Sequence, residues 1–155
     1  MNSKAMYKMT YGLFLLTAKA EGKDNGCIIN TAIQVANDPT RVSIAVINKN
    51  HTCDMIKASG EFNVSALSKE VPFSLFQRFG MQSGRDVEKF ADFSKVERSA
   101  NGLYYLTEGA NMFLSCKVVD SMELGSHTLF IGEVTDGEVL SAAESCSYSY
   151  YQSDI

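Results

Sequence analysis

The 155-residue chain has no tryptophan, only two prolines, and no Cys-x-x-Cys pair. So few prolines exclude a Pro-rich linker, and 45% hydrophobic with 21% charged residues is the balance of a globular protein rather than a disordered one. The four cysteines are widely separated, and neither His51 nor His127 stands near one of them at zinc-ligand spacing. We therefore expect no metal site. The cysteines are Cys27, Cys53, Cys116 and Cys146.

A surplus of positive charge is also missing. Lys and Arg total 14 against 18 Asp and Glu, which gives a net charge of −4 and a pI near 5.2. Binding to a phosphate backbone requires the opposite balance, so we expect no nucleic-acid partner. The early apolar run Leu13-Phe14-Leu15-Leu16 is too short for a signal peptide or a membrane span. We expect no membrane association and a cytoplasmic location, where thiols stay reduced.

Short runs of aromatic and β-branched residues, separated by polar turns, predict a mainly β protein with short helices. The predicted strands are 11–18, 27–35, 41–47, 61–67, 95–98, 111–120 and 128–135. Asn25-Gly26 predicts a tight hairpin turn between the first two strands, and 37–39 predicts a second turn. One short helix is predicted over 52–59, closed by Gly60, and another begins at Pro72 and ends at Gly80. This order favours a closed or nearly closed barrel over a doubly wound sheet, in a single domain spanning 1–155.

Common catalytic signatures are absent from the chain. GxGxxG, GxxxxGK[ST] and GxSxG do not occur, so a Rossmann site, a P-loop and a serine hydrolase elbow are not supported. Three polar segments and one histidine remain as candidates for a binding site.

The first candidate is Asn48-Lys49-Asn50-His51-Thr52, at the start of the first predicted helix. A helix N-terminus with an adjacent lysine suits a phosphate group. The alternative is ordinary capping, in which Asn50 or Thr52 only closes the helix, and spacing alone favours it.

The other candidates have equally plain alternatives. The segment Asn30-Thr31-Ala32-Ile33-Gln34-Val35 suits a flat ligand held against the backbone, or a solvated edge strand. In the segment 83–90, Arg85 and Lys89 suit a phosphate, or are neutralised by neighbouring carboxylates. His127, at the entrance of a predicted strand, suits a ligand contact or a bond to a nearby carbonyl.

Taken together, these segments resemble the flavin reductase family, and most of all the flavin domains of high-molecular-weight rubredoxins. The resemblance extends from Tyr7 to about Tyr151. The residues that carry it are Tyr11-Gly12-Leu13, the segment 25–31, Asn48-Lys49-Asn50, and the segments 83–90 and 127–134.

This resemblance implies a homodimeric FMN-binding split barrel with one flavin in each subunit. By position, the flavin ring would be lined by Asn30, Thr31, Ala32, Ile33 and Gln34. The flavin phosphate would be held by Asn48, Lys49, Asn50 and Thr52, supported by Ser83 and Arg85. His127 would be the catalytic residue, beside the flavin where nicotinamide docks.

The implied activity is that of an NAD(P)H:flavin oxidoreductase, which transfers hydride from nicotinamide to N5 of FMN and electrons onward to an acceptor. FAD is the alternative flavin. The candidate acceptors are a separate rubredoxin, a flavodiiron protein and a monooxygenase. The alternative function is a flavoredoxin-like, FMN-carrying electron-transfer protein that a partner protein reduces in place of NAD(P)H.

Three features depart from the family pattern. Ser126 precedes the histidine where an acidic residue is frequent, and only Pro39 remains where two prolines often follow the second strand. No rubredoxin segment follows Tyr151, so we expect any rubredoxin partner to be a separate protein.

Overall fold

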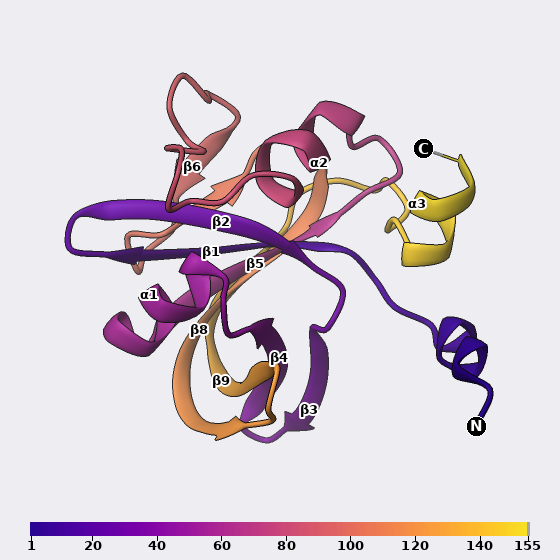
Figure 1. Ribbon diagram of the computed structural model, residues 1–155. Helices are drawn as coiled ribbons and strands as arrows, with labels where there is room; N and C mark the ends of the chain where they lie inside the picture. The colour runs from indigo at the N-terminus through magenta and orange to yellow at the C-terminus, as the bar shows by residue number, and fades with distance from the viewer. Residues whose placement is uncertain (155) are drawn as a thin grey trace.

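A seven-stranded antiparallel sheet organises the computed structural model, which describes residues 1–154 (Figure 1). Its strand order is β2-β1-β5-β8-β9-β4-β3, so β2 and β3 are the edge strands and the ladder does not close on itself. The strands are β1 (Phe14–Ala20), β2 (Lys23–Ile29), β3 (Ile33–Asn37), β4 (Thr40–Ile47), β5 (Glu61–Leu67), β8 (Ala110–Glu123) and β9 (His127–Val139).

Short helices and one small hairpin complete the fold. The helices are the 3-10 helix η1 (Ser3–Lys8), α1 (His51–Ser59), α2 (Phe73–Gly80) and α3 (Tyr148–Asp154). The strands β6 (Val96–Arg98) and β7 (Tyr104–Leu106) pair with each other in a separate two-stranded sheet. The prediction of a mainly β protein with short helices is confirmed. No helix within residues 1–154 is long and apolar enough to cross a membrane.

The turn of the first hairpin lies earlier than predicted. Ala20 pairs with Lys23, so Glu21 and Gly22 form the turn, with φ of 52° and 76°. Asn25 is instead buried within β2, where it donates a hydrogen bond to the Thr52 hydroxyl at 2.9 Å. Gly26 is closely packed there, because a Cβ would lie 3.1 Å from the carbonyl oxygen of Leu16. The prediction of a turn at Asn25-Gly26 was wrong. Asn25 bonds to Thr52 and Gly26 packs against Leu16, and neither contact can be read from the local sequence pattern.

The predicted strand 27–35 is interrupted. β2 ends at Ile29 and β3 begins at Ile33, and the two strands lie at opposite edges of the sheet. The prediction was most accurate at β5, which spans 61–67 as expected, and at Gly60, which closes α1 with φ 74°. The segments η1, β7 and α3 were not predicted, and β8 and β9 are longer than expected.

Apolar side chains pack on both faces of the sheet. On β1, Leu16 belongs to a cluster with Ile56 of α1, whereas the adjacent Leu15 belongs to a second cluster with Phe79 of α2. Successive strand residues point to opposite faces, so one strand serves both clusters. α1 and α2 therefore cover different faces of the sheet.

Candidate functional site

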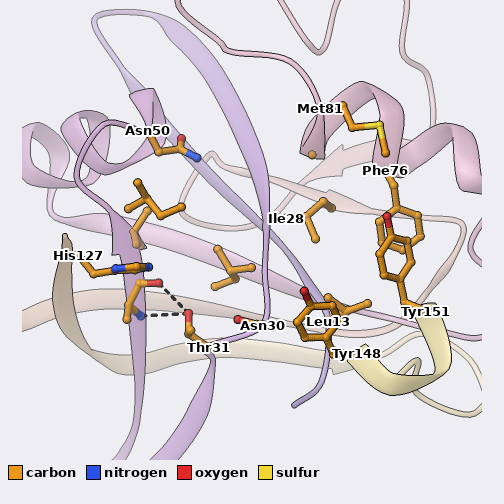
Figure 2. A pocket seen from close by; sticks show the side chains of 15 residues that line it. Leu13, Ile28, Asn30, Thr31, Asn50, Phe76, Met81, His127, Tyr148 and Tyr151 are labelled. Atoms are coloured by element: carbon orange, nitrogen blue, oxygen red, sulfur yellow. Dashed lines mark hydrogen bonds between the residues drawn. The ribbon is translucent and has the colours of Figure 1, made fainter. Parts of the chain in front are cut away.

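A cavity of about 290 Å³ lies where β2, β4, α1, α2 and α3 converge (Figure 2). Its walls are mostly apolar, with a few polar groups, as is typical of sites for small molecules. Figure 2 shows His127 and Asn50 on one side and Phe76, Tyr148 and Tyr151 on the other. The lining residues are Leu13, Ile28, Ile29, Asn30, Thr31, Ala45, Val46, Ile47, Asn50, Phe76, Gly80, Met81, His127, Tyr148 and Tyr151.

The break between β2 and β3 forms one wall of this cavity. Thr31 closes the break against β4, because its hydroxyl donates to the carbonyl of Ala45 at 2.7 Å and accepts from the Ala45 N–H at 3.2 Å (Figure 2). Asn30 and Thr31 line the cavity, as predicted for ring-binding residues. The other three predicted ring residues do not line it. Ala32 packs against the apolar core, while Ile33 and Gln34 are exposed on the edge strand β3.

The start of α1 lies at the cavity through Asn50. Asn50 is the N-cap, and its side chain accepts a hydrogen bond from the Thr52 N–H at 2.9 Å. Thr52 is buried, and its hydroxyl accepts from Asn25. Asn50 is therefore a helix cap, as the capping alternative has it, whereas Thr52 is the second residue of α1 and its hydroxyl bonds to Asn25 rather than to the helix end. Lys49 is exposed beside them at the helix N-terminus.

Asn48 has a different set of partners. Its amide donates to Glu123 at 2.7 Å and to the Gly125 carbonyl at 3.0 Å, and its oxygen accepts from Thr128 at 2.6 Å. These contacts use both of its N–H groups. Asn48 does not line the cavity, although Ile47 and Asn50 on either side of it do.

Ser83 and Arg85 lie on the other side of the α1 N-terminus. The Ser83 hydroxyl accepts from the Arg85 N–H at 3.1 Å, and the Arg85 guanidinium pairs with Asp54 of α1. Arg85 lines a second cavity of about 640 Å³ together with His51. The two consecutive residues at the start of α1 thus line different cavities: Asn50 lines the first and His51 lines the second. Arg85 therefore reaches this helix end from the side of the second cavity.

Lys89 does not point outward as a phosphate ligand would. It is only 3% exposed, and its ammonium donates to the carbonyls of Gly26 and Phe79 at 2.9 and 3.0 Å. Burial lowers the pKa of the Lys89 ammonium, opposed by the nearby Cys27. The phosphate interpretation of Lys89 is wrong, because this side chain links β2 to α2 inside the protein.

His127 begins β9 and lines the cavity from the side opposite α3 (Figure 2). It lies beside Ile47 in the sheet, and its Nδ1 is 2.8 Å from the hydroxyl of Ser126. The ring therefore has a hydrogen-bond partner on its Nδ1 edge. This is an arrangement in which Nε2 is available for another contact.

The aromatic wall was missed at the sequence level. Tyr151 packs on Phe76 with ring centroids 4.4 Å apart, and Tyr148 packs against Tyr11 at 6.2 Å. The backbone N–H of Tyr148 also donates to the Tyr11 carbonyl at 2.9 Å. The concentration of tyrosines in Tyr148-Ser149-Tyr150-Tyr151 was the available signal, because exposed C-terminal segments rarely carry three aromatic residues in four.

The cysteines lie inside the protein as free thiols. Burial raises the pKa of Cys27 to about 11 and that of Cys116 to about 12. Across residues 1–154, no group of three or more His, Cys, Asp or Glu side chains is placed to hold a metal ion.

A family model described as "Flavin reductase like domain" matches residues 6–155. The chain belongs to this family. It is 38% identical over 151 residues to the high molecular weight rubredoxin of Moorella thermoacetica, covering 97% of this chain and 66% of that protein. It is 36% identical over 151 residues to a ferric-chelate reductase (NAD(P)H) of Archaeoglobus fulgidus, covering 97% of this chain and 89% of that protein.

Solved structures agree with this assignment. A flavin reductase in its native state superposes with a TM-score of 0.79 at 27% identity, covering 95% of this chain and 93% of that one. An NADH:FAD oxidoreductase of Streptomyces globisporus has the same fold, with a TM-score of 0.83 at 23% identity, covering 93% and 84%. The resemblance seen in the sequence is confirmed, and the chain is an oxidoreductase of a flavin-dependent family.

Proposed function

We propose that this flavin reductase family member is an NAD(P)H:flavin oxidoreductase, with the ring of FMN, or of FAD, held in the 290 Å³ cavity. The observation that carries the proposal is that the β2–β3 break, the start of α1 and His127 converge on one apolar cavity. The ferric-chelate reductase (NAD(P)H), 36% identical to this chain, supports the choice of electron donor.

The cavity suits a flavin ring in size and chemistry. Small-molecule sites commonly enclose roughly 300–1,000 Å³, so this cavity is sized for one ring system rather than a whole dinucleotide. Leu13 and Ile28 offer flat apolar contact, while the main chain at Asn30 and Thr31 offers hydrogen-bonding groups at the interrupted strand. When bound, the flavin supplies the hydride-accepting chemistry, so the protein needs no nucleophile of its own.

The phosphate end of the flavin is assigned to the α1 N-terminus. Lys49 is exposed there, and the helix contributes partial positive charge. Arg85 approaches the same end from the second cavity and exchanges its Asp54 partner for the phosphate, while the Ser83 hydroxyl supports Arg85 by accepting its backbone N–H. Asn50 and Thr52 support the site by holding the cap in place. His127 remains the proposed catalytic residue, donating from Nε2 toward the reacting rings.

A homodimeric split barrel completes the proposal. Ile33 and Val35, on the edge strand β3, are 64% and 51% exposed. Large apolar side chains on an edge strand are a liability unless another surface covers them. A second copy of the chain seated here accounts for that exposure and brings Ala32, Ile33 and Gln34 into a shared site. Sedimentation velocity at micromolar concentration tests this, with a dimer expected and a monomer contradicting it.

The experiment that tests the function is an anaerobic visible spectrum of the protein loaded with FMN, before and after addition of NADH or NADPH. Prompt bleaching of the bound flavin is expected, and the faster donor defines the nucleotide preference. Bound flavin that stays oxidised favours the alternative, an electron-transfer protein that another protein reduces. Absence of any bound flavin contradicts the site assignment.

The same FMN-loaded protein, once reduced, can be used to identify the electron acceptor. The high molecular weight rubredoxin, a diflavin flavoprotein of Synechocystis and the reductase component of a Rhodococcus nitrophenol monooxygenase are relatives of this chain. Rubredoxin, a flavodiiron protein and a monooxygenase are therefore the acceptors to offer the reduced protein first, with free flavin as a fourth. The rate of flavin reoxidation by each one ranks them.

A further inference from the structure

Side chains from three neighbouring strands meet at the tip of the β8–β9 hairpin. Asn48 follows the end of β4, Thr128 lies on β9, and Glu123 is the last residue of β8. Thr128 donates to Asn48, and Asn48 donates to Glu123, so a continuous line of hydrogen bonds crosses the sheet. The Gly125 N–H also donates to Glu123 at 2.9 Å, which closes the turn itself.

The same residues are joined through the backbone. The Asn48 N–H donates to the carbonyl of Ser126 at 3.0 Å, and the Leu124 N–H donates to the carbonyl of His127 at 2.9 Å. The first bond ties the hairpin tip to the end of β4, and the second closes the turn of the hairpin next to His127.

These contacts are on the opposite side of β9 from the cavity. His127 lines the cavity, whereas the next residue, Thr128, is only 4% exposed and points to the other face of the sheet. Asn48 does not line the cavity either. This cluster therefore lies beside the cavity through its chain neighbours: His127 precedes Thr128, and Ile47, which precedes Asn48, pairs with His127 in the sheet.

We propose that Asn48, Glu123 and Thr128 form a latch that fixes the hairpin tip and thereby positions His127 at the cavity. Glu123 is the exposed member, and its carboxylate is the acceptor for both Asn48 and Gly125. These hydrogen bonds, from Asn48 first and then Gly125, lower the pKa of Glu123, so Glu123 is a carboxylate near neutral pH. The proposal rests on the function proposed above for His127, but the latch itself can be tested without it.

The first test is amide hydrogen exchange on the flavin-free protein. Glu123→Ala removes the acceptor from an exposed position, so folding is preserved. We expect the hydrogen-exchange rates of the backbone N–H groups of Asn48 and Leu124 to rise about three- to tenfold. This is the factor that corresponds to the loss of one net hydrogen bond. Asp120→Ala is the matched control, because it removes the same charge from the same hairpin and Asp120 bonds only to its neighbour Ser121 among the described contacts. Equal exchange in the two variants overturns the latch.

Two further variants separate hydrogen bonding from charge. Glu123→Gln keeps an acceptor oxygen for Asn48 and Gly125, so it must behave like the parent protein. Asn48→Ala must raise exchange as Glu123→Ala does, and the double variant must be no worse than either single variant, since all three break the same line of bonds. Additive effects overturn the proposal.

The second readout is flavin reduction by NAD(P)H. In Glu123→Ala, the limiting rate at saturating nucleotide falls about tenfold or more while FMN affinity changes less than about twofold, because only the position of His127 changes. A loss of FMN affinity in both Asn48→Ala and Glu123→Ala contradicts a positioning role. If the parent protein is not reduced by NAD(P)H at all, the proposed function fails, while the exchange result still decides the latch.

Discussion

Tyr151 of α3 packs on Phe76 of α2 with ring centroids 4.4 Å apart, so the C-terminal helix supplies one wall of the cavity. The cavity is therefore complete only when α3 is docked in place. The wall is held from outside by the Tyr148–Tyr11 backbone hydrogen bond and by the pairing of Gly12 with Ser147. Flavin binding and docking of α3 should accordingly depend on each other.

Removing the Tyr151 ring tests this dependence. Tyr151→Ala should weaken FMN binding about three- to tenfold, since an aromatic pair contributes about 0.5–1.5 kcal/mol beyond its buried area. Fluorescence titration of FMN measures the change. Tyr151→Phe is the matched control because it keeps the ring on Phe76. Equal affinity in the alanine and phenylalanine variants would show that the wall does not contact the flavin.

His127 should affect the reaction rather than cofactor binding. His127→Ala removes the side chain that faces the cavity from the start of β9, and we expect flavin reduction by NAD(P)H to slow about tenfold or more. FMN affinity should stay nearly unchanged. Stopped-flow reduction and FMN titration measure the two quantities separately, and a collapse of flavin binding at an unchanged rate would contradict the assignment.

Lys49 should distinguish FMN from riboflavin. Lys49→Gln removes the exposed charge beside the α1 N-terminus, so FMN affinity should fall about tenfold while riboflavin, which has no phosphate, binds as before. The control is Lys117→Gln, which changes an exposed lysine on β8 that lines neither of the two cavities described above. An equal loss for both ligands would place the phosphate elsewhere.

The thiols should be unreactive at neutral pH. Burial raises the pKa of Cys27 to about 11, so at pH 8 only about one molecule in a thousand carries the thiolate there. Labelling with a disulfide reagent should be slow at pH 8 in the native protein and should accelerate as pH rises toward that pKa. Complete reaction in denaturant is the control, and rapid native labelling at pH 8 would contradict the burial of these side chains.

Local features that depend on the type of a single residue, or on a short local pattern, were predicted well from the sequence. Gly60 closes α1 because a left-handed φ favours glycine, and β5 alternates in a way that only a strand explains. Asn25-Gly26 misled the turn prediction because its buried partners, Thr52 and Leu16, are far away in sequence. Long-range contacts of this kind leave no mark on local pattern.

The site could be predicted only in part, because several of its contacts join residues that are far apart in the sequence. The resemblance to flavin reductases selected Asn30, Thr31, Asn50 and His127, which all line the cavity, while their contact with flavin stays a prediction. It gave no warning that Asn48 is engaged with Glu123, since their contact joins residues 75 positions apart. Nor did it indicate that Lys89 is buried, because an ammonium bonded to two backbone carbonyls leaves no signature in neighbouring residues.

The interruption between β2 and β3 has a consequence for mutational tolerance. Every residue except proline presents the same N–H and C=O groups, so the main-chain recognition of flavin proposed at positions 30 and 31 survives most changes of side chain. A saturation library at Asn30 should therefore retain flavin binding widely, with proline the main exclusion. Thr31 should be the intolerant position of the two, because its hydroxyl is what fastens the gap to Ala45.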